Sequence, residues 1–225
     1  MTAPIITLAE RVLSVRFSDR QRMLSWSLTR PGAVTTHTVA WLKVDDADLP
    51  IDVNPATVLR KRLEAAGHAD AVQLMTSRDV RKHHQARHAF GAAKAFCLAT
   101  VGLANAGRVG AAQRSHEQAG TINLVAQIDQ ALDDAGLLEA MSIAAQARTA
   151  AVIDLGLKRD GLLVTGTGTD CIVVACPSVG PRQTYAGLHT DIGRAIGAVV
   201  YDAVLAGGQE WVAENIGKWQ AGDQQ

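Results

Sequence analysis

The sequence has no excess of charge of either sign and no long apolar run. Lysine and arginine number 22, aspartate and glutamate also number 22, and the formal net charge is zero. Proteins that bind nucleic acids usually carry a basic excess, and the one basic cluster, 78–87, has no aromatic residues between its charges. A membrane helix needs roughly 18 apolar residues, whereas the longest candidate run, 196–205, is interrupted by Tyr201 and Asp202. We therefore expect neither a nucleic-acid partner nor a membrane partner.

Cysteine motifs and nucleotide-binding fingerprints are also missing. The three cysteines, Cys97, Cys171 and Cys176, have no CxxC spacing and lie in apolar sequence, which indicates small buried side chains in a reducing compartment. The N-terminus does not have the pattern of a secretory signal. Neither GxxxxGK[ST] nor a GxGxxG motif before a helix is present. The expected location is the cytoplasm.

The patterning predicts one α+β domain over residues 1–225, with an antiparallel or mixed sheet covered by helices. Alternating apolar residues predict strands at 11–17, 23–28, 36–44, 71–76, 89–101 and 121–129. Polar residues at 18–21 predict a hairpin turn between the first two strands. Helices are expected to begin at Asn54-Pro55 and to cover 131–155, 191–205 and 211–219.

Four short loops rich in glycine and small polar side chains follow in the second half of the chain. Each is predicted to lie at the end of a strand or helix, where binding sites usually form. They cover 100–107, 120–123, 165–170 and 185–190. The loop 165–170, Thr-Gly-Thr-Gly-Thr-Asp, lies between two apolar runs and places three hydroxyls and a carboxylate within six residues. It is either a tight structural corner or the floor of an active site.

These loops contain the groups that hydrolysis of an amide or ester requires. Asp170 could act as the base or could orient His189, and Thr167 or Thr169 could be a nucleophile only if a base deprotonates it. Donors to an oxyanion could come from two amide side chains, Asn105 and Asn123. The structural alternative is that the aspartate caps a turn and that the threonines bond the backbone.

The histidines give weaker signals. His84 and His88 are four residues apart, a spacing that can hold zinc on a helix, but no glutamate follows His84 and the segment borders a strand. We interpret His83, His84 and His88 as part of a solvated basic face. His116 is a candidate lid or substrate contact.

Six segments in this order resemble the adenosylcobinamide amidohydrolase family. They are 74–79, 99–106, 120–123, 145–150, 164–170 and 185–189. The resemblance extends over roughly residues 70–205.

The resemblance implies hydrolysis of the amide that joins the aminopropanol arm to the corrin ring of adenosylcobinamide. The products would be adenosylcobyric acid, which re-enters cobalamin synthesis, and 1-amino-2-propanol; some members are similar but act on complete cobamides. We expect no protein-bound cofactor, because the cobalt enters with the corrinoid substrate. The candidate catalytic residues are Asp170, Thr167 and Thr169. The candidate substrate-binding residues are Asn105, Thr121, Asn123, Gln146, Arg148, Thr165 and His189.

One segment departs from the family pattern. The family commonly has Glu-Ala-Lys-Thr where this chain has Gln146-Ala-Arg148-Thr. Loss of that carboxylate motivates an alternative, a corrinoid-binding protein without catalysis; another is an unrelated amidase for a smaller substrate. Trp211 and Trp219, on a moderately apolar C-terminal helix, would suit either a homodimer or docking of that helix on its own domain.

Overall fold

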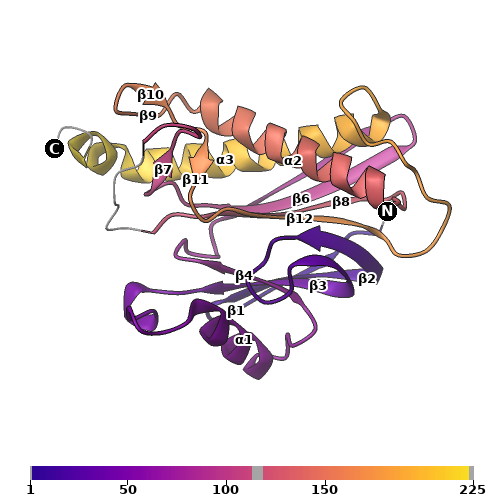
Figure 1. Ribbon diagram of the computed structural model, residues 1–225, viewed down its shortest axis with the longest axis horizontal. Helices are drawn as coiled ribbons and strands as arrows, with labels where there is room; N and C mark the ends of the chain where they lie inside the picture. The colour runs from indigo at the N-terminus through magenta and orange to yellow at the C-terminus, as the bar shows by residue number, and fades with distance from the viewer. Residues whose placement is uncertain (1, 113–118, 223–225) are drawn as a thin grey trace.

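One mixed β-sheet bends so that its two halves face each other, and helices cover both outer surfaces (Figure 1). This is a computed structural model, and it describes residues 2–112 and 119–222. The predicted α+β class with a mixed sheet is confirmed. The arrangement has four layers: a helix pair, one half of the sheet, the other half of the sheet, and a single helix.

The sheet has the order β4-β3-β2-β12-β8-β6-β5, and β1 adds to β2. Its strands are β1 (Ile5–Ala9), β2 (Val12–Ser25), β3 (Gly32–Lys43), β4 (Val72–Thr76), β5 (His83–Phe90), β6 (Ala93–Val101), β8 (Ile122–Ile128) and β12 (Cys171–Pro177). Only the pairs β3–β4 and β8–β12 are parallel. Two short ladders complete the strands: β9 (Lys158–Arg159) with β10 (Leu162–Leu163), and β7 (Ala106–Gly107) with β11 (Gly166–Thr167).

The helices begin where the sequence provides caps. They are α1 (Pro55–Ala65), α2 (Asp134–Asp154) and α3 (Asp191–Gly222), with a single 3-10 turn, η1, at Asp46–Asp48. Asn54 accepts hydrogen bonds from the backbone N–H groups of Ala56 and Thr57, as expected for an N-cap followed by proline. Asp133 caps α2 through the N–H of Gly136 at 2.9 Å.

Three apolar clusters hold the layers together. α2 and α3 pack on one face of β6, β8 and β12. The opposite face of these strands packs against β2, β3 and β4, with Trp41, Phe96 and Leu98 fully buried between the halves of the sheet. α1 covers the outer face of β3 and β4 through Leu59 and Leu63. The bend therefore brings the end of β4 close to the start of β8.

Three expectations about single elements are corrected. The predicted hairpin turn at 18–21 is part of one continuous strand, β2, whose pairing with β3 shifts register between Arg16 and Gln21. The two C-terminal helices are one helix, α3. The single strand predicted at 89–101 is instead the end of β5 and the whole of β6, which pair antiparallel, and the histidines lie on β5.

The two C-terminal tryptophans dock on their own chain. Trp211 and Trp219 are 7% and 8% exposed and meet edge to face. The indole N–H of Trp219 donates to the carbonyl oxygen of Lys158 at 3.1 Å, and Arg159 stacks on its ring. Of the two roles considered for these side chains, the structure has the intrachain one.

Candidate active site

A cleft of about 680 Å³ opens between the two halves of the sheet. Its walls come from the ends of β2 and β4, the start of β8, the loop before β12, and the segments on either side of η1. Four of the predicted residues line this cleft: Thr121, Asn123, Thr169 and Asp170. Two of the small polar loops thus form one wall.

The Asp170 carboxylate is the most heavily bonded group in this wall. Its side chain is 6% exposed and lies 2.8 Å from an Arg148 guanidinium nitrogen. It accepts the backbone N–H of Ile122 at 3.0 Å and that of Thr167 at 3.1 Å, and it also accepts the Thr167 hydroxyl. Four donors on two oxygens fix the loop to β8 and to α2. The arrangement combines the turn-capping role with a buried ion pair.

Arg148 reaches this loop because Gly166 leaves room for it. A Cβ at Gly166 would lie 1.8 Å from a guanidinium nitrogen of Arg148, so a larger residue here would displace the guanidinium from the loop. The same guanidinium donates to the carbonyl oxygen of Thr165 at 3.0 Å. The Thr165 hydroxyl accepts the N–H of Val109 at 2.8 Å. Arg148, Thr165 and Thr167 therefore hold the loop from behind the cleft.

Thr121 and Thr169 form a hydroxyl pair on the cleft side. Their Oγ1 atoms are 2.7 Å apart, and the Thr169 hydroxyl donates to the carbonyl oxygen of Gly120 at 2.8 Å. A hydroxyl has one proton, so Thr121 must be the donor in the shared bond. The lone pairs of the Thr121 oxygen remain available to a donor in the cleft.

Two amide side chains of residues that line the cleft are buried, and so are their oxygen atoms. Asn123 and Gln73 are 1% and 2% exposed and both line it. Asn123 donates from Nδ2 to the carbonyl oxygen of Met75 at 2.7 Å, and Gln73 donates from Nε2 to that of His68 at 3.2 Å. A carbonyl only accepts, which fixes the orientation of both amides. Their Oδ1 and Oε1 atoms have no hydrogen-bond partner in residues 2–112 and 119–222.

An exposed tryptophan lies at the mouth of the cleft. Trp26 is 47% exposed, and its indole N–H donates to the backbone oxygen of Asp170 at 2.6 Å. Leu28, 58% exposed, lines the same cleft. Cys171 also lines it, and burial raises the pKa of its thiol to about 12. The cleft therefore combines a fixed polar wall with an apolar rim and a neutral thiol.

The remaining predicted residues lie elsewhere. Asn105 is half-buried behind the wall, against Gly120. Gln146 is exposed on α2, where it donates to Ser142 at 3.0 Å. It lines a separate depression of about 530 Å³, here called the α2–α3 groove, whose residues include His88, Leu188, Tyr201 and Asp202.

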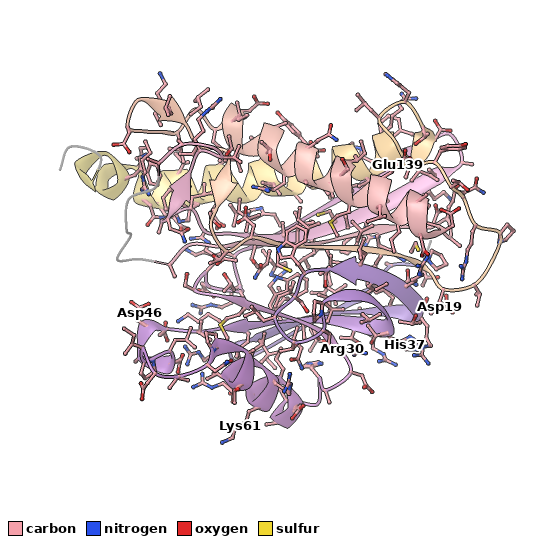
Figure 2. The ribbon with its side chains drawn as sticks, in the orientation of Figure 1. Asp19, Arg30, His37, Asp46, Lys61 and Glu139 are labelled. Atoms are coloured by element: carbon pink, nitrogen blue, oxygen red, sulfur yellow. The ribbon has the colours of Figure 1, made fainter. Side chains whose placement is uncertain are left out.

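The loop that contains His189 lies at the other end of α2. His189 is exposed, and its loop is held by Glu139, which accepts the N–H of Ala186 at 2.8 Å. In Figure 2, Glu139 and Asp46, a residue that lines the cleft, lie on opposite sides of the molecule. The structure thus does not bring His189 to Asp170.

Two of the three histidines of β5 are paired with acidic side chains of α3, and His83 contacts the carbonyl oxygen of Val80 at 2.9 Å. His84 lies 3.0 Å from Glu210 and His88 lies 2.6 Å from Asp202, both on α3. No group of three or more His, Cys, Asp or Glu in the described part of the chain could hold a metal ion. His116 lies outside the described residues. No helix in the ranges given above is long and apolar enough to cross a membrane.

Sequence reasoning missed Gln73 and Trp26. Gln73 is a polar residue inside an apolar strand, Val72–Thr76, and a buried polar side chain needs a partner; that signal was available. Trp26 gave no such signal, because its role depends on a contact with Asp170, 144 residues away.

Comparisons with known proteins identify the family of the chain. The sequence profile of the family described as adenosylcobinamide amidohydrolase matches residues 3–216. A protein of that name from Halobacterium salinarum is 38% identical over 157 residues, which are 64% of this chain and 63% of the relative. An uncharacterized protein from Methanocaldococcus jannaschii is 34% identical over 92 residues, 40% of this chain and 36% of the relative. The chain thus matches less than two thirds of the length of either relative.

Among solved structures, the PH0078 protein from Pyrococcus horikoshii is similar with a TM-score of 0.43 and 8% identity. The match covers 91% of this chain and 82% of that one. This degree of similarity does not indicate a function.

Proposed function

The chain belongs to the adenosylcobinamide amidohydrolase family, and from that premise we propose that it hydrolyses the amide joining aminopropanol to the corrin ring of adenosylcobinamide. Water adds to the amide carbonyl carbon, the C–N bond breaks, and the amine leaves with a proton. The products are adenosylcobyric acid and 1-amino-2-propanol. The acid can then re-enter cobalamin synthesis, which makes the reaction a salvage step.

The observation that carries this proposal is the composition of the cleft wall. Two of the segments that resemble the family, 120–123 and 164–170, meet there and place Thr121, Thr169 and Asn123 on the cleft. A volume of about 680 Å³ suits a ligand of substantial size, and polar groups are few and fixed. We place the scissile amide against this wall.

Within this site we assign Asp170 to holding the loop. As a base it would first have to exchange one of its four donors for the attacking water. As an anchor it needs no change, because the donors from Ile122 and Arg148 already fix the wall. Catalysis depends on such positioning, since a misplacement of about 1 Å can cost roughly 100-fold in rate.

We assign Thr121 to contact with the reacting groups. Its hydroxyl proton is directed to Thr169, so its oxygen can accept a hydrogen bond from the attacking water or from the substrate amide N–H. Trp26 presents its half-exposed ring at the mouth and is positioned to stack on the apolar corrin.

The test is direct. The full chain is incubated with adenosylcobinamide, and mass spectrometry follows cobyric acid and 1-amino-2-propanol. We expect both products in equal amounts with the wild type and a large loss with Thr121→Val, which keeps the shape and removes the hydroxyl. Binding of adenosylcobinamide without either product would overturn the proposal in favour of a corrinoid-binding protein.

A further inference from the structure

We propose that Arg78 is a positioning residue: by holding the turn after β4 to α3, it fixes the part of the cleft wall that carries Thr121. The inference rests on the proposed function, because it names what keeps that same wall in place. Arg78 lies in one of the six segments that resemble the family, 74–79, and directly follows Ser77, which lines the cleft. We assign Arg78 no contact with the substrate, so that it acts through its neighbours.

Two carboxylates of one helix hold the guanidinium of Arg78. Its side chain is 9% exposed, and its two terminal nitrogens lie 3.2 Å from a Glu210 oxygen and 2.7 Å from a Glu214 oxygen. The two glutamates are four residues apart on α3 and therefore lie on the same face of the helix. A planar guanidinium can bond both carboxylates at once, whereas the ammonium group of lysine is a single point of charge. The turn after β4 is thus tied to α3 at two points.

α3 comes close to the sheet at this place because Gly207 lies three residues before Glu210. A Cβ at Gly207 would lie 2.8 Å from the side chain of Val101, on β6, and 3.2 Å from that of His84, on β5. A larger residue would push the helix away from these strands. The close approach therefore sets the carboxylates within reach of the turn.

Two further cations bond the same carboxylates. His84 lies 3.0 Å from Glu210, and the ammonium group of Lys82 donates to Glu214. Hydrogen bonds from Lys82 and Arg78 hold the pKa of Glu214 below its usual range. Glu214 is therefore ionised at neutral pH and available as a partner to Arg78.

Two contacts extend this hold from the turn to the cleft wall. A Cβ built at Gly102 would lie 3.6 Å from the Cβ of Arg78 and 3.4 Å from the backbone nitrogen of Thr121, and the N–H of Gly102 donates to the carbonyl oxygen of Thr121 at 3.0 Å. The hydroxyl of Ser77 donates to the carbonyl oxygen of Ala119 at 2.8 Å. Both contacts bear on the short stretch of chain that leads into β8.

The place of Thr121 matters because we assign its hydroxyl oxygen to the reacting groups. A misplacement of about 1 Å can cost roughly 100-fold in rate. Interactions made only in the transition state change kcat, whereas those made equally in the bound ground state change KM. Loss of Arg78 should therefore lower kcat and leave KM nearly unchanged. A purely structural role would lower the Tm and leave both kinetic constants of the folded protein as they are.

The chain offers a matched control in Arg22. This arginine is partly buried on β2, pairs with Asp134 in the first turn of α2, and donates to the carbonyl oxygen of Leu132 at 3.3 Å. It also ties a strand of the sheet to a helix, but it is not among the described residues that line the cleft or contact Thr121. Arg22→Met therefore removes the same chemical group at a place that does not support the cleft wall.

The experiment compares Arg78→Met, Arg78→Lys and Arg22→Met with the wild type on adenosylcobinamide, at a temperature well below the lowest Tm. Arg78→Met should lower kcat about 30- to 100-fold with KM within about threefold of wild type. Arg78→Lys keeps a cation that can bond one carboxylate and should recover at least about fivefold in kcat. Arg22→Met should keep kcat within about threefold. A folded Arg78→Met with the kcat of the wild type, or an equal loss of kcat in Arg22→Met, would overturn the inference.

A milder pair of variants serves if Arg78→Met does not fold. Glu214→Gln removes the charge of one partner of Arg78 at an exposed position, and Lys82→Met removes the other cation bonded to that same carboxylate. Glu214→Gln should lower kcat about 3- to 10-fold, whereas Lys82→Met should stay within about twofold of wild type. An unchanged kcat in Glu214→Gln, or the same loss in both variants, would count against the role of Arg78.

Failure of the proposed function gives a different result. Wild-type protein that binds adenosylcobinamide and releases no product would overturn that function. Crystal structures of Arg78→Met and Arg22→Met would then decide the inference. Displacement of Thr121 in Arg78→Met alone would support it, and a Thr121 that keeps its wild-type place in Arg78→Met would overturn it.

Discussion

The cleft and the α2–α3 groove are both lined by side chains from the segments that resemble the family. The two sites differ in how deeply these side chains are buried and in how many hydrogen bonds hold them. In the cleft, Asp170 is 6% exposed and bound by four donors. In the groove, Gln146 is exposed and bonds only to Ser142 of its own helix among the described residues. Most buried polar groups in folded proteins have hydrogen-bond partners arranged around them. The difference favours the cleft over the groove as the proposed active site.

This comparison changes the meaning of the Gln146 departure. Gln146 and Arg148 are two residues apart on a helix and therefore point in different directions. Arg148 reaches the Asp170 loop, whereas Gln146 faces the groove. The missing carboxylate is thus remote from the cleft wall, and it gives no reason to expect an inactive protein.

The largest effect is expected from breaking the anchor. Asp170→Asn removes the charge that pairs with Arg148 and turns an NH₂ group toward existing donors. Loss of one partner of a buried pair costs about 3–5 kcal/mol, and at about 2–4 °C per kcal/mol the Tm should fall by roughly 6 °C or more. We expect kcat/KM to fall at least about 100-fold. Calorimetry and product release measure the two quantities.

The pH profile distinguishes an anchor from a base. If Asp170 anchors the loop, the residual activity of Asp170→Asn keeps the acid limb of the wild-type profile, and Arg148→Met shows a comparable loss in activity and Tm. Disappearance of the acid limb in Asp170→Asn, with Arg148→Met close to wild type, would assign Asp170 as the base.

A smaller effect is expected at the mouth of the cleft. Trp26→Ala removes a half-exposed ring that we place against the corrin, and loss of part of its apolar contact should raise KM about tenfold. The other three tryptophans are buried, so acrylamide quenching reports mainly on Trp26. Substrate should protect this fluorescence in the wild type. Unchanged KM together with unprotected fluorescence would remove Trp26 from the site.

Cys171 should have little influence although it lines the cleft. Burial raises its pKa to about 12, so roughly one thiol in 10,000 is ionised at pH 8, and the thiolate is the reactive form. Alkylation by iodoacetamide should therefore be slow in the folded protein. Cys171→Ala should keep kcat/KM within about threefold, whereas abolished activity in a folded variant would identify a thiol nucleophile.

The smallest effect is expected in the α2–α3 groove. Gln146→Glu restores the carboxylate of the family pattern at an exposed position, and surface substitutions usually change stability by less than about 0.5 kcal/mol. Activity should stay within about twofold of wild type. His189→Ala, at another exposed position, provides the parallel measurement. A gain of tenfold or more in Gln146→Glu would move the active site to the groove.

Local patterns were sufficient for much of the fold. Asn54-Pro55 marked the start of α1, and the apolar spacing marked α2. They failed where packing overrides a local signal. The predicted helices at 191–205 and 211–219 are continuous through Gly207 and Gly208, where a Cβ would approach Val101 at 2.8 Å and Leu155 at 2.4 Å. The two glycines therefore allow α3 to pack closely against Val101 and Leu155.

The site was also partly predictable from local sequence patterns. The loop 165–170 and the segment 120–123 were recognised from glycine and hydroxyl content, and the structure brings them together. Gln73 and Trp26 join them only because the sheet bends and sets β4 and the end of β2 against β8 and β12. That bend depends on contacts between distant strands, which no short segment encodes.

A crystal structure of the wild-type protein with adenosylcobyric acid, the proposed product, tests the central claim most directly. The carboxylate that hydrolysis creates should lie within about 3.5 Å of the Thr121 hydroxyl, with the corrin against Trp26. A corrin seated in the α2–α3 groove against Gln146 and Leu188, with the cleft empty, would contradict the account.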